Sequence, residues 1–131
     1  MDAQDGTMVA VMLSSTPADR LARARLALEG LSLGDAFGEQ FFVRSGLLGQ
    51  LIAERALPAP PWRFTDDTPM ALSVAGSLVH FDRIDQDWLA QSFAGQYQPS
   101  RGYGLAMHHL LPAIGAGAAW RELSAGLFGQ V

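Results

Sequence analysis

The sequence predicts an all-α protein of about five or six helices. Apolar residues recur at helical spacing in one segment after another, capping residues and prolines mark the segment ends, and no stretch alternates apolar and polar residues as a strand does. With 131 residues, 49% hydrophobic and 17% charged, the chain has the length and composition of one folded domain.

The composition excludes several classes of function. Thirteen acidic residues outnumber nine basic ones, all arginine, and no basic run is present, so we expect no nucleic-acid partner and no membrane-binding patch. The absence of cysteine excludes disulfides, thiolate zinc sites and cysteine nucleophiles. No apolar stretch reaches the roughly 20 residues of a membrane helix. We therefore expect a soluble, cytoplasmic protein.

The first helix is predicted after a loose leader over residues 1–14, with the domain covering residues 15–131. Thr16 can cap the helix, Pro17 suits its first position and Asp19 faces its positive end. Apolar positions continue the helix toward Phe37. Gly30, Gly34 and Gly38 recur on one of its faces, each at a cost of about 1 kcal/mol relative to alanine. Either tight helix packing or an approaching ligand explains that spacing.

Similar signals predict the later elements. A second helix falls within residues 41–56, and three prolines between residues 57 and 61 then impose a loop. The third helix covers residues 65–79. A fourth starts at a cap on Asp85 and stops before Pro99, and a turn-rich loop follows. The last two helices are expected over residues 105–114, bent at Pro112, and 118–127.

Thr65-Asp66-Asp67-Thr68, at the start of the third helix, contains the most informative residues for function. Two adjacent carboxylates repel each other and are costly to hold together without a cation or several donors. Magnesium prefers oxygen ligands, which carboxylates flanked by hydroxyls supply. The alternative is structural, with Thr65 or Asp66 capping the helix and Asp67 facing its dipole. Asp35 and Glu39, near the end of the first helix, are weaker candidates.

Three segments together resemble the ADP-ribosylglycohydrolase family, the relatives of dinitrogenase-reductase-activating glycohydrolase. They are Gly30-Leu31-Ser32-Leu33-Gly34-Asp35-Ala36-Phe37-Gly38, Phe64-Thr65-Asp66-Asp67-Thr68-Pro69-Met70 and Pro99-Ser100-Arg101-Gly102-Tyr103-Gly104. Their order, spacing and helical context match over residues 22–128. With the other two segments in register, the second is specific and favours the metal interpretation over the cap.

The resemblance implies an all-helical hydrolase that removes ADP-ribose from a modified protein side chain or small molecule, using two Mg²⁺ ions or sometimes Mn²⁺. It implies that Thr65, Asp66 and Asp67 bind metal, with both aspartates catalytic. It places Asp35 beside the site, where we expect it and Glu39 to contribute to substrate binding. The matching loop of Arg101, Gly102 and Tyr103 is structural or close to the substrate.

Two departures from the family pattern lead to further expectations. Phe42 stands where many members carry a glutamate, a role that Glu39 takes over or that is absent. The family's second aspartate cluster and its glycine-rich substrate loop lie beyond residue 131. We therefore expect an incomplete, N-terminal part of the larger fold, with little turnover alone and an exposed apolar face that favours self-association. The alternative is a non-catalytic binding or structural module derived from the family, like the lens crystallins that resemble it.

Overall fold

The computed structural model describes residues 16–43, 46 and 48–127, and within them the fold is all-α, as the sequence predicts. The elements are α2 (Pro17–Val43), α3 (Leu48–Glu54), α4 (Asp67–Phe81), α5 (Gln86–Gln96), the 3₁₀-helix η2 (Pro99–Arg101), α6 (Leu105–Gly115) and α7 (Trp120–Leu127). The predicted leader over residues 1–14 lies outside the described residues. No helix in the described ranges is long and apolar enough to cross a membrane.

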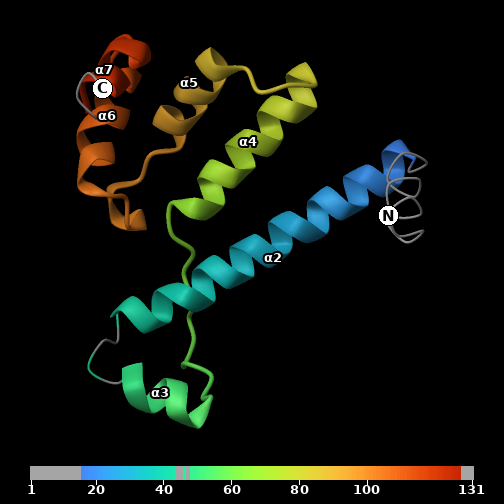
Figure 1. Cartoon of the computed structure of the whole chain (residues 1–131), viewed down its shortest axis with the longest axis vertical. Helices are drawn as coiled ribbons and strands as arrows, with labels where there is room; N and C mark the ends of the chain where they lie inside the picture. Colours follow the sequence, from blue (N-terminus) through green and yellow to red (C-terminus); the bar gives the residue numbers. More distant parts are fainter. Residues whose placement is uncertain (1–15, 44–45, 47, 128–131) are drawn as a thin grey trace, which may run out of the picture.

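The helices after α3 pack in chain order, α4 against α5, α5 against α6 and α6 against α7. The long helix α2 makes its main contact with α4 and extends away from the group (Figure 1). The two helices meet near the start of α4 and enclose an apolar groove of about 860 Å³ along their diverging lengths. The rim of that groove is open to solvent, with Leu21 66% and Val79 75% exposed.

Local capping signals are confirmed at two helix starts. Before α2, Asp19 accepts hydrogen bonds from the Thr16 amide at 3.0 Å and hydroxyl at 2.7 Å, and Thr16 Oγ1 accepts from the Asp19 amide at 3.1 Å. Before α5, the Asp85 carboxylate accepts from the Trp88 amide at 3.0 Å. Each cap joins residues three apart in the sequence, so the pattern contains the whole interaction.

The first helix runs further than the sequence predicts, to Val43 rather than to about Phe37, and α3 is correspondingly short. Aromatic packing accompanies the extra turns. The Phe37 ring lies 4.9 Å from Phe41 in the next turn and 5.3 Å from Trp62 in the proline loop, both edge-on. These contacts offset the low helix propensity of Gly38.

Small residues bring α4 and α5 close together. A Cβ built on Gly76 would lie 2.9 Å from the Trp88 ring, so the indole packs directly on the α4 backbone. One turn earlier, the buried Ser73 hydroxyl accepts hydrogen bonds from Ser92 at 2.9 Å and Gln96 at 2.8 Å. The interface therefore combines an aromatic contact with a fully bonded polar group.

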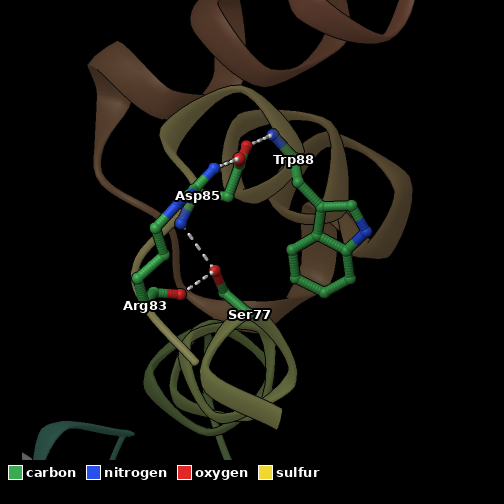
Figure 2. A network of polar contacts seen from close by, with 4 residues as sticks. All are labelled: Ser77, Arg83, Asp85 and Trp88. Atoms are coloured by element: carbon green, nitrogen blue, oxygen red, sulfur yellow. Dashed lines mark hydrogen bonds and ion pairs between the residues drawn. The ribbon is translucent and has the colours of Figure 1, made fainter. Parts of the chain in front are cut away.

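Ser77 ties the end of α4 to the start of α5 (Figure 2). Its side chain is 0% exposed. The hydroxyl donates to the Arg83 carbonyl at 3.0 Å and accepts from the Asp85 amide at 2.8 Å. Because Asp85 also caps α5, the bonds of Ser77 hold the turn and the cap together.

Many large apolar side chains remain exposed, whereas the buried apolar residues of the described part are few: Ala36, Tyr103, Leu111 and Ile114. The exposed set includes Leu21, Leu33, Leu72 and Val79 on α2 and α4. This agrees with the expectation of an uncovered apolar face. Self-association through that face stays a prediction.

Replacing Ser77 with alanine is expected to destabilise the chain by about 1–3 kcal/mol, because the Asp85 amide and Arg83 carbonyl each lose a buried partner. Urea denaturation measures the change. Ser124→Ala is the control, since that hydroxyl donates only to Arg121 in its own helix. Equal stabilities of the two variants would contradict the structural role of Ser77.

Candidate active site

The candidate site residues come from two segments that lie far apart in the sequence, and most of them line one cleft. It has a volume of about 520 Å³ and lies between the C-terminal half of α2 and the start of α4. Its lining residues are Leu31, Gly34, Asp35, Gly38, Glu39, Phe42, Thr65 and Asp67. Four of the five candidate site residues therefore share this cleft, and Asp66 adjoins them in the sequence.

The glycines of α2 face open space. Among the described residues, no atom beyond the local helix backbone and chain neighbours lies within 4 Å of a Cβ built on Gly30, Gly34 or Gly38. Tight helix packing therefore does not explain their spacing in this part of the chain. Gly34 and Gly38 instead line the cleft beside Asp35, where they contribute no side chains.

Asp35 joins α2 to the start of α4. Its carboxylate accepts hydrogen bonds from the hydroxyl groups of Thr65 and Thr68, both at 2.6 Å. It also accepts from their amides, at 3.0 Å from Thr65 and 3.2 Å from Thr68. Partial burial alone would raise the pKa of Asp35, but the hydrogen bonds from both threonines outweigh it and lower the pKa below its ordinary value.

This geometry corrects the alternative in which Thr65 or Asp66 caps the third helix. Asp66 occupies the position before α4, yet its side chain accepts no capping hydrogen bond. The Thr65 hydroxyl donates to Asp35 rather than accepting from the helix. The cap comes from Asp35, about 30 residues earlier in the sequence. Its carboxylate accepts hydrogen bonds from the Thr68 amide in the first turn of α4 and from the Thr65 amide just before the helix.

The carboxylates of Asp66 and Asp67 have no hydrogen-bond or ion-pair partner within the described part of the chain. Although Asp67 is exposed as a residue, partial desolvation of its carboxyl raises its pKa, and repulsion from Asp66 and Asp35 adds to the rise. The ionised form of Asp67 is therefore disfavoured. A cation nearby would remove that penalty.

These groups fit part of the coordination shell of a hard cation. Asp66 and Asp67 offer free carboxylate oxygens, and the Thr65 hydroxyl, whose proton points to Asp35, still has lone pairs. No group of three or more acidic or histidine side chains in the described ranges is arranged to hold a metal ion. The described residues could therefore supply only some of the ligands.

Glu39 and Phe42 lie on the α2 side of the cleft. Phe42, at the position where the resemblance leads us to expect a glutamate, is 80% exposed. Glu39 is half-buried and is, with Asp35 and Asp67, one of three acidic residues that line the cleft. Its position is compatible with contact to a substrate in the cleft.

The loop that follows α5 lies against the segment that leads into α4. The Arg101 guanidinium donates to the Phe64 carbonyl at 2.9 Å, and a Cβ built on Gly102 would lie 3.6 Å from Thr65 Cβ. Tyr103 is buried, and burial, followed by the negative charge of Asp66, raises the pKa of its phenol. Arg101, Gly102 and Tyr103 therefore lie beside the segment that carries the acidic pair.

Two functional contacts are absent from the sequence prediction. Thr68 is buried and its hydroxyl donates to Asp35, a contact that the sequence alone does not predict. The bond from Arg101 to Phe64 joins residues 37 apart. The sequence signal that could indicate a role for Thr68 is the symmetry of Thr65-Asp66-Asp67-Thr68, in which a threonine stands on each side of the acids.

Asp35→Asn is expected to lower stability at pH 7 by about 2 kcal/mol or more, because one carboxylate oxygen becomes a donor that faces the donors of Thr68. Asp35 has a lowered pKa in the folded state, so its contribution is present above the unfolded-state pKa and disappears as pH falls through the folded-state value. The difference from wild type should therefore shrink below about pH 4. Urea denaturation at pH 7 and pH 3 measures it.

Asp67→Asn is expected to change the stability of the metal-free chain in the opposite direction, or not at all. The raised pKa of Asp67 means that its ionised form opposes folding at neutral pH, so the amide should leave the metal-free chain as stable as wild type or more so. A destabilisation by Asp67→Asn equal to that by Asp35→Asn would contradict this assignment of roles.

Comparison with known proteins identifies the family that this chain resembles. The ADP-ribosylglycohydrolase family model matches residues 16–130. The chain is 28% identical to the ADP-ribosylhydrolase ARH3 of Xenopus tropicalis over 106 residues, 74% of this chain and 30% of that protein. It is 34% identical to ADP-ribosylhydrolase ARH3 of Gallus gallus over 103 residues, 66% of this chain and 28% of that protein.

The chain thus spans less than a third of the length of these curated relatives. No solved structure matches it significantly. The matched region includes the cleft, the acidic pair at the start of α4 and the loop that packs on them. On this match across nearly all of its length, the chain belongs to the ADP-ribosylglycohydrolase family.

Proposed function

We propose that this chain carries part of the active site of a magnesium-dependent hydrolase that removes ADP-ribose from a modified protein side chain or small molecule. The observation that carries the proposal is that the carboxylates of Asp66 and Asp67, beside a cleft in a chain of this family, have no partner among the residues that the structure describes. Its matched relatives are named ADP-ribosylhydrolases, which supports the class of reaction.

In this proposal, Thr65, Asp66 and Asp67 hold Mg²⁺, with Mn²⁺ as a substitute. When bound, the metal supplies positive charge that orients the sugar and a water molecule for attack. Hydrolysis breaks the bond between the anomeric carbon and the departing side-chain atom; the water oxygen joins the carbon, and a proton goes to the leaving group. Asp35 orients Thr65 through the bond at 2.6 Å, and Glu39 contacts the substrate.

The proposal also includes low turnover by the 131-residue chain alone. The described residues gather no group of three acidic or histidine side chains around one point. A magnesium ion requires near-octahedral oxygen coordination, so three neighbouring residues hold it weakly even with waters. Weak retention of the metal would leave the attacking water poorly oriented.

A second candidate function is a non-catalytic helical module. The observation that favours it is Phe42, an exposed apolar side chain on the rim of the cleft where the family resemblance implies a glutamate. Such a module would bind its partner through apolar surface. Its melting temperature and oligomeric state would not change with magnesium or a chelator.

Isothermal titration of the chain with Mg²⁺ and Mn²⁺ tests the metal site. We expect Asp67→Asn to weaken binding about tenfold or more, and saturating metal to raise the melting temperature of wild type. Asp82→Asn is the matched control, because Asp82 is an exposed aspartate at the opposite end of α4. Equal metal affinity in wild type and Asp67→Asn would contradict the proposed site.

Hydrolysis of ADP-ribosyl-arginine and ADP-ribosyl-serine peptides tests the reaction. We expect a version of the protein extended downstream to release ADP-ribose with magnesium, and the 131-residue chain to release little. Asp66→Asn in the extended version should abolish most turnover, because a ligand is lost. An inactive extended version, together with unchanged metal affinity in Asp67→Asn, would favour the non-catalytic module.

A further inference from the structure

Arg101 fixes the short segment that leads into the acidic pair. Its Nη1 donates to the Phe64 carbonyl at 2.9 Å, and its guanidinium lies over the Phe64 ring at 4.0 Å from the centroid. Its Nε donates to Gln98 at 3.0 Å, which anchors the side chain within its own loop. Phe64 is thus held by both its backbone and its ring, immediately before Thr65.

Gly102 allows the backbone of the same loop to pass close to the segment that carries Thr65 and Asp66. Its φ of +85° is a left-handed conformation that favours glycine. A Cβ built there would lie 3.6 Å from Thr65 Cβ and 3.9 Å from Asp66 Oδ1, so the loop backbone passes close to both residues, with the space of one methyl group between them. Arg101 and Gly102 therefore act on adjacent parts of one segment.

We propose that Arg101 is a positioning residue for the metal site formed by Thr65, Asp66 and Asp67. It acts through Phe64, setting the direction in which the chain enters α4 and hence the separation of the metal-binding oxygens. Asp35 holds Thr65 from the α2 side, while Arg101 and Gly102 hold the segment from the loop after α5. This inference rests on the proposed metal-binding function.

Positioning and simple electrostatics predict opposite effects of removing Arg101. A guanidinium near the acidic pair repels a divalent cation, so loss of its charge alone would tighten metal binding. Loss of positioning would weaken it, because the ligand oxygens would no longer be held in the geometry that a small hard cation requires. The sign of the change therefore distinguishes the two roles.

The test is isothermal titration of the full 131-residue chain with Mn²⁺, alongside urea denaturation without metal. We expect Arg101→Gln and Arg101→Lys each to weaken affinity about tenfold or more, since lysine keeps the charge but not the planar fork. The control is Arg63→Gln. Arg63 and Arg101 line a second pocket, of about 570 Å³, and Arg63 is exposed and has no hydrogen-bond or ion-pair partner in the described ranges. Arg63→Gln should bind as wild type or more tightly.

Unchanged or tighter binding by Arg101→Gln, or wild-type affinity in Arg101→Lys, would overturn the positioning role. If wild type itself bound no Mn²⁺, or if Asp67→Asn bound as tightly as wild type, the proposed metal site would fail first and this inference with it. Wild-type binding lost in Asp67→Asn but kept in Arg101→Gln would refute the positioning role alone.

Two alanine substitutions at separate glycines test the proposal if the arginine variants do not fold. Gly102→Ala and Gly117→Ala both place a Cβ at positive φ, +85° and +97°, and should cost similar backbone strain. Gly117 lies between α6 and α7, away from the acidic pair, with no atom of the described residues near its built Cβ. Only Gly102→Ala should reduce Mn²⁺ affinity; equal affinities in the two variants would overturn the proposal.

Discussion

The carboxylate of Asp35 holds the start of α4 against α2, and the site depends on that connection. Its two oxygens receive the amides and hydroxyls of Thr65 and Thr68, which lie 30 and 33 residues later. Without it, the first amides of α4 would need a local cap, and Asp66 occupies the position to provide one. Because Asp35 performs that task, the carboxylates of Asp66 and Asp67 are not used as caps and have no partner among the described residues.

This division of roles explains why Asp35 and Asp67, two acidic residues of the same cleft, have pKa values shifted in opposite directions. Asp35 is surrounded by donors, so its negative charge is stabilised. The Asp67 carboxyl is partly desolvated, lies near two other carboxylates and receives no donor within the described residues, so its charge is disfavoured and its pKa is raised. Unfavourable interactions of this kind are expected at functional sites, where a bound cation offsets them. On the opposite side, the loop carrying Arg101 and Gly102 restricts the same segment.

The sequence was sufficient for interactions between near neighbours and insufficient for those between distant ones. The caps at Thr16 and Asp85 were predictable because donor and acceptor lie three residues apart. The extension of α2 past Gly38 was not, since it is accompanied by contact with Trp62 in a later loop. At the site, the acidic pair drew attention through its mutual repulsion, whereas the bonds of Asp35 to Thr68 and of Arg101 to Phe64 depend on how the helices meet.

The most direct test of the central claim is an amide NMR spectrum of the ¹⁵N-labelled chain titrated with small amounts of Mn²⁺, which broadens resonances near its binding site. If Asp35 caps α4 and leaves the acidic pair free, the broadening should centre on the amides of Thr65 to Thr68 and extend to Asp35 across the cleft. Uniformly unaffected resonances, or broadening centred instead on the amides around Asp82 and Asp85 at the other end of α4, would contradict this account.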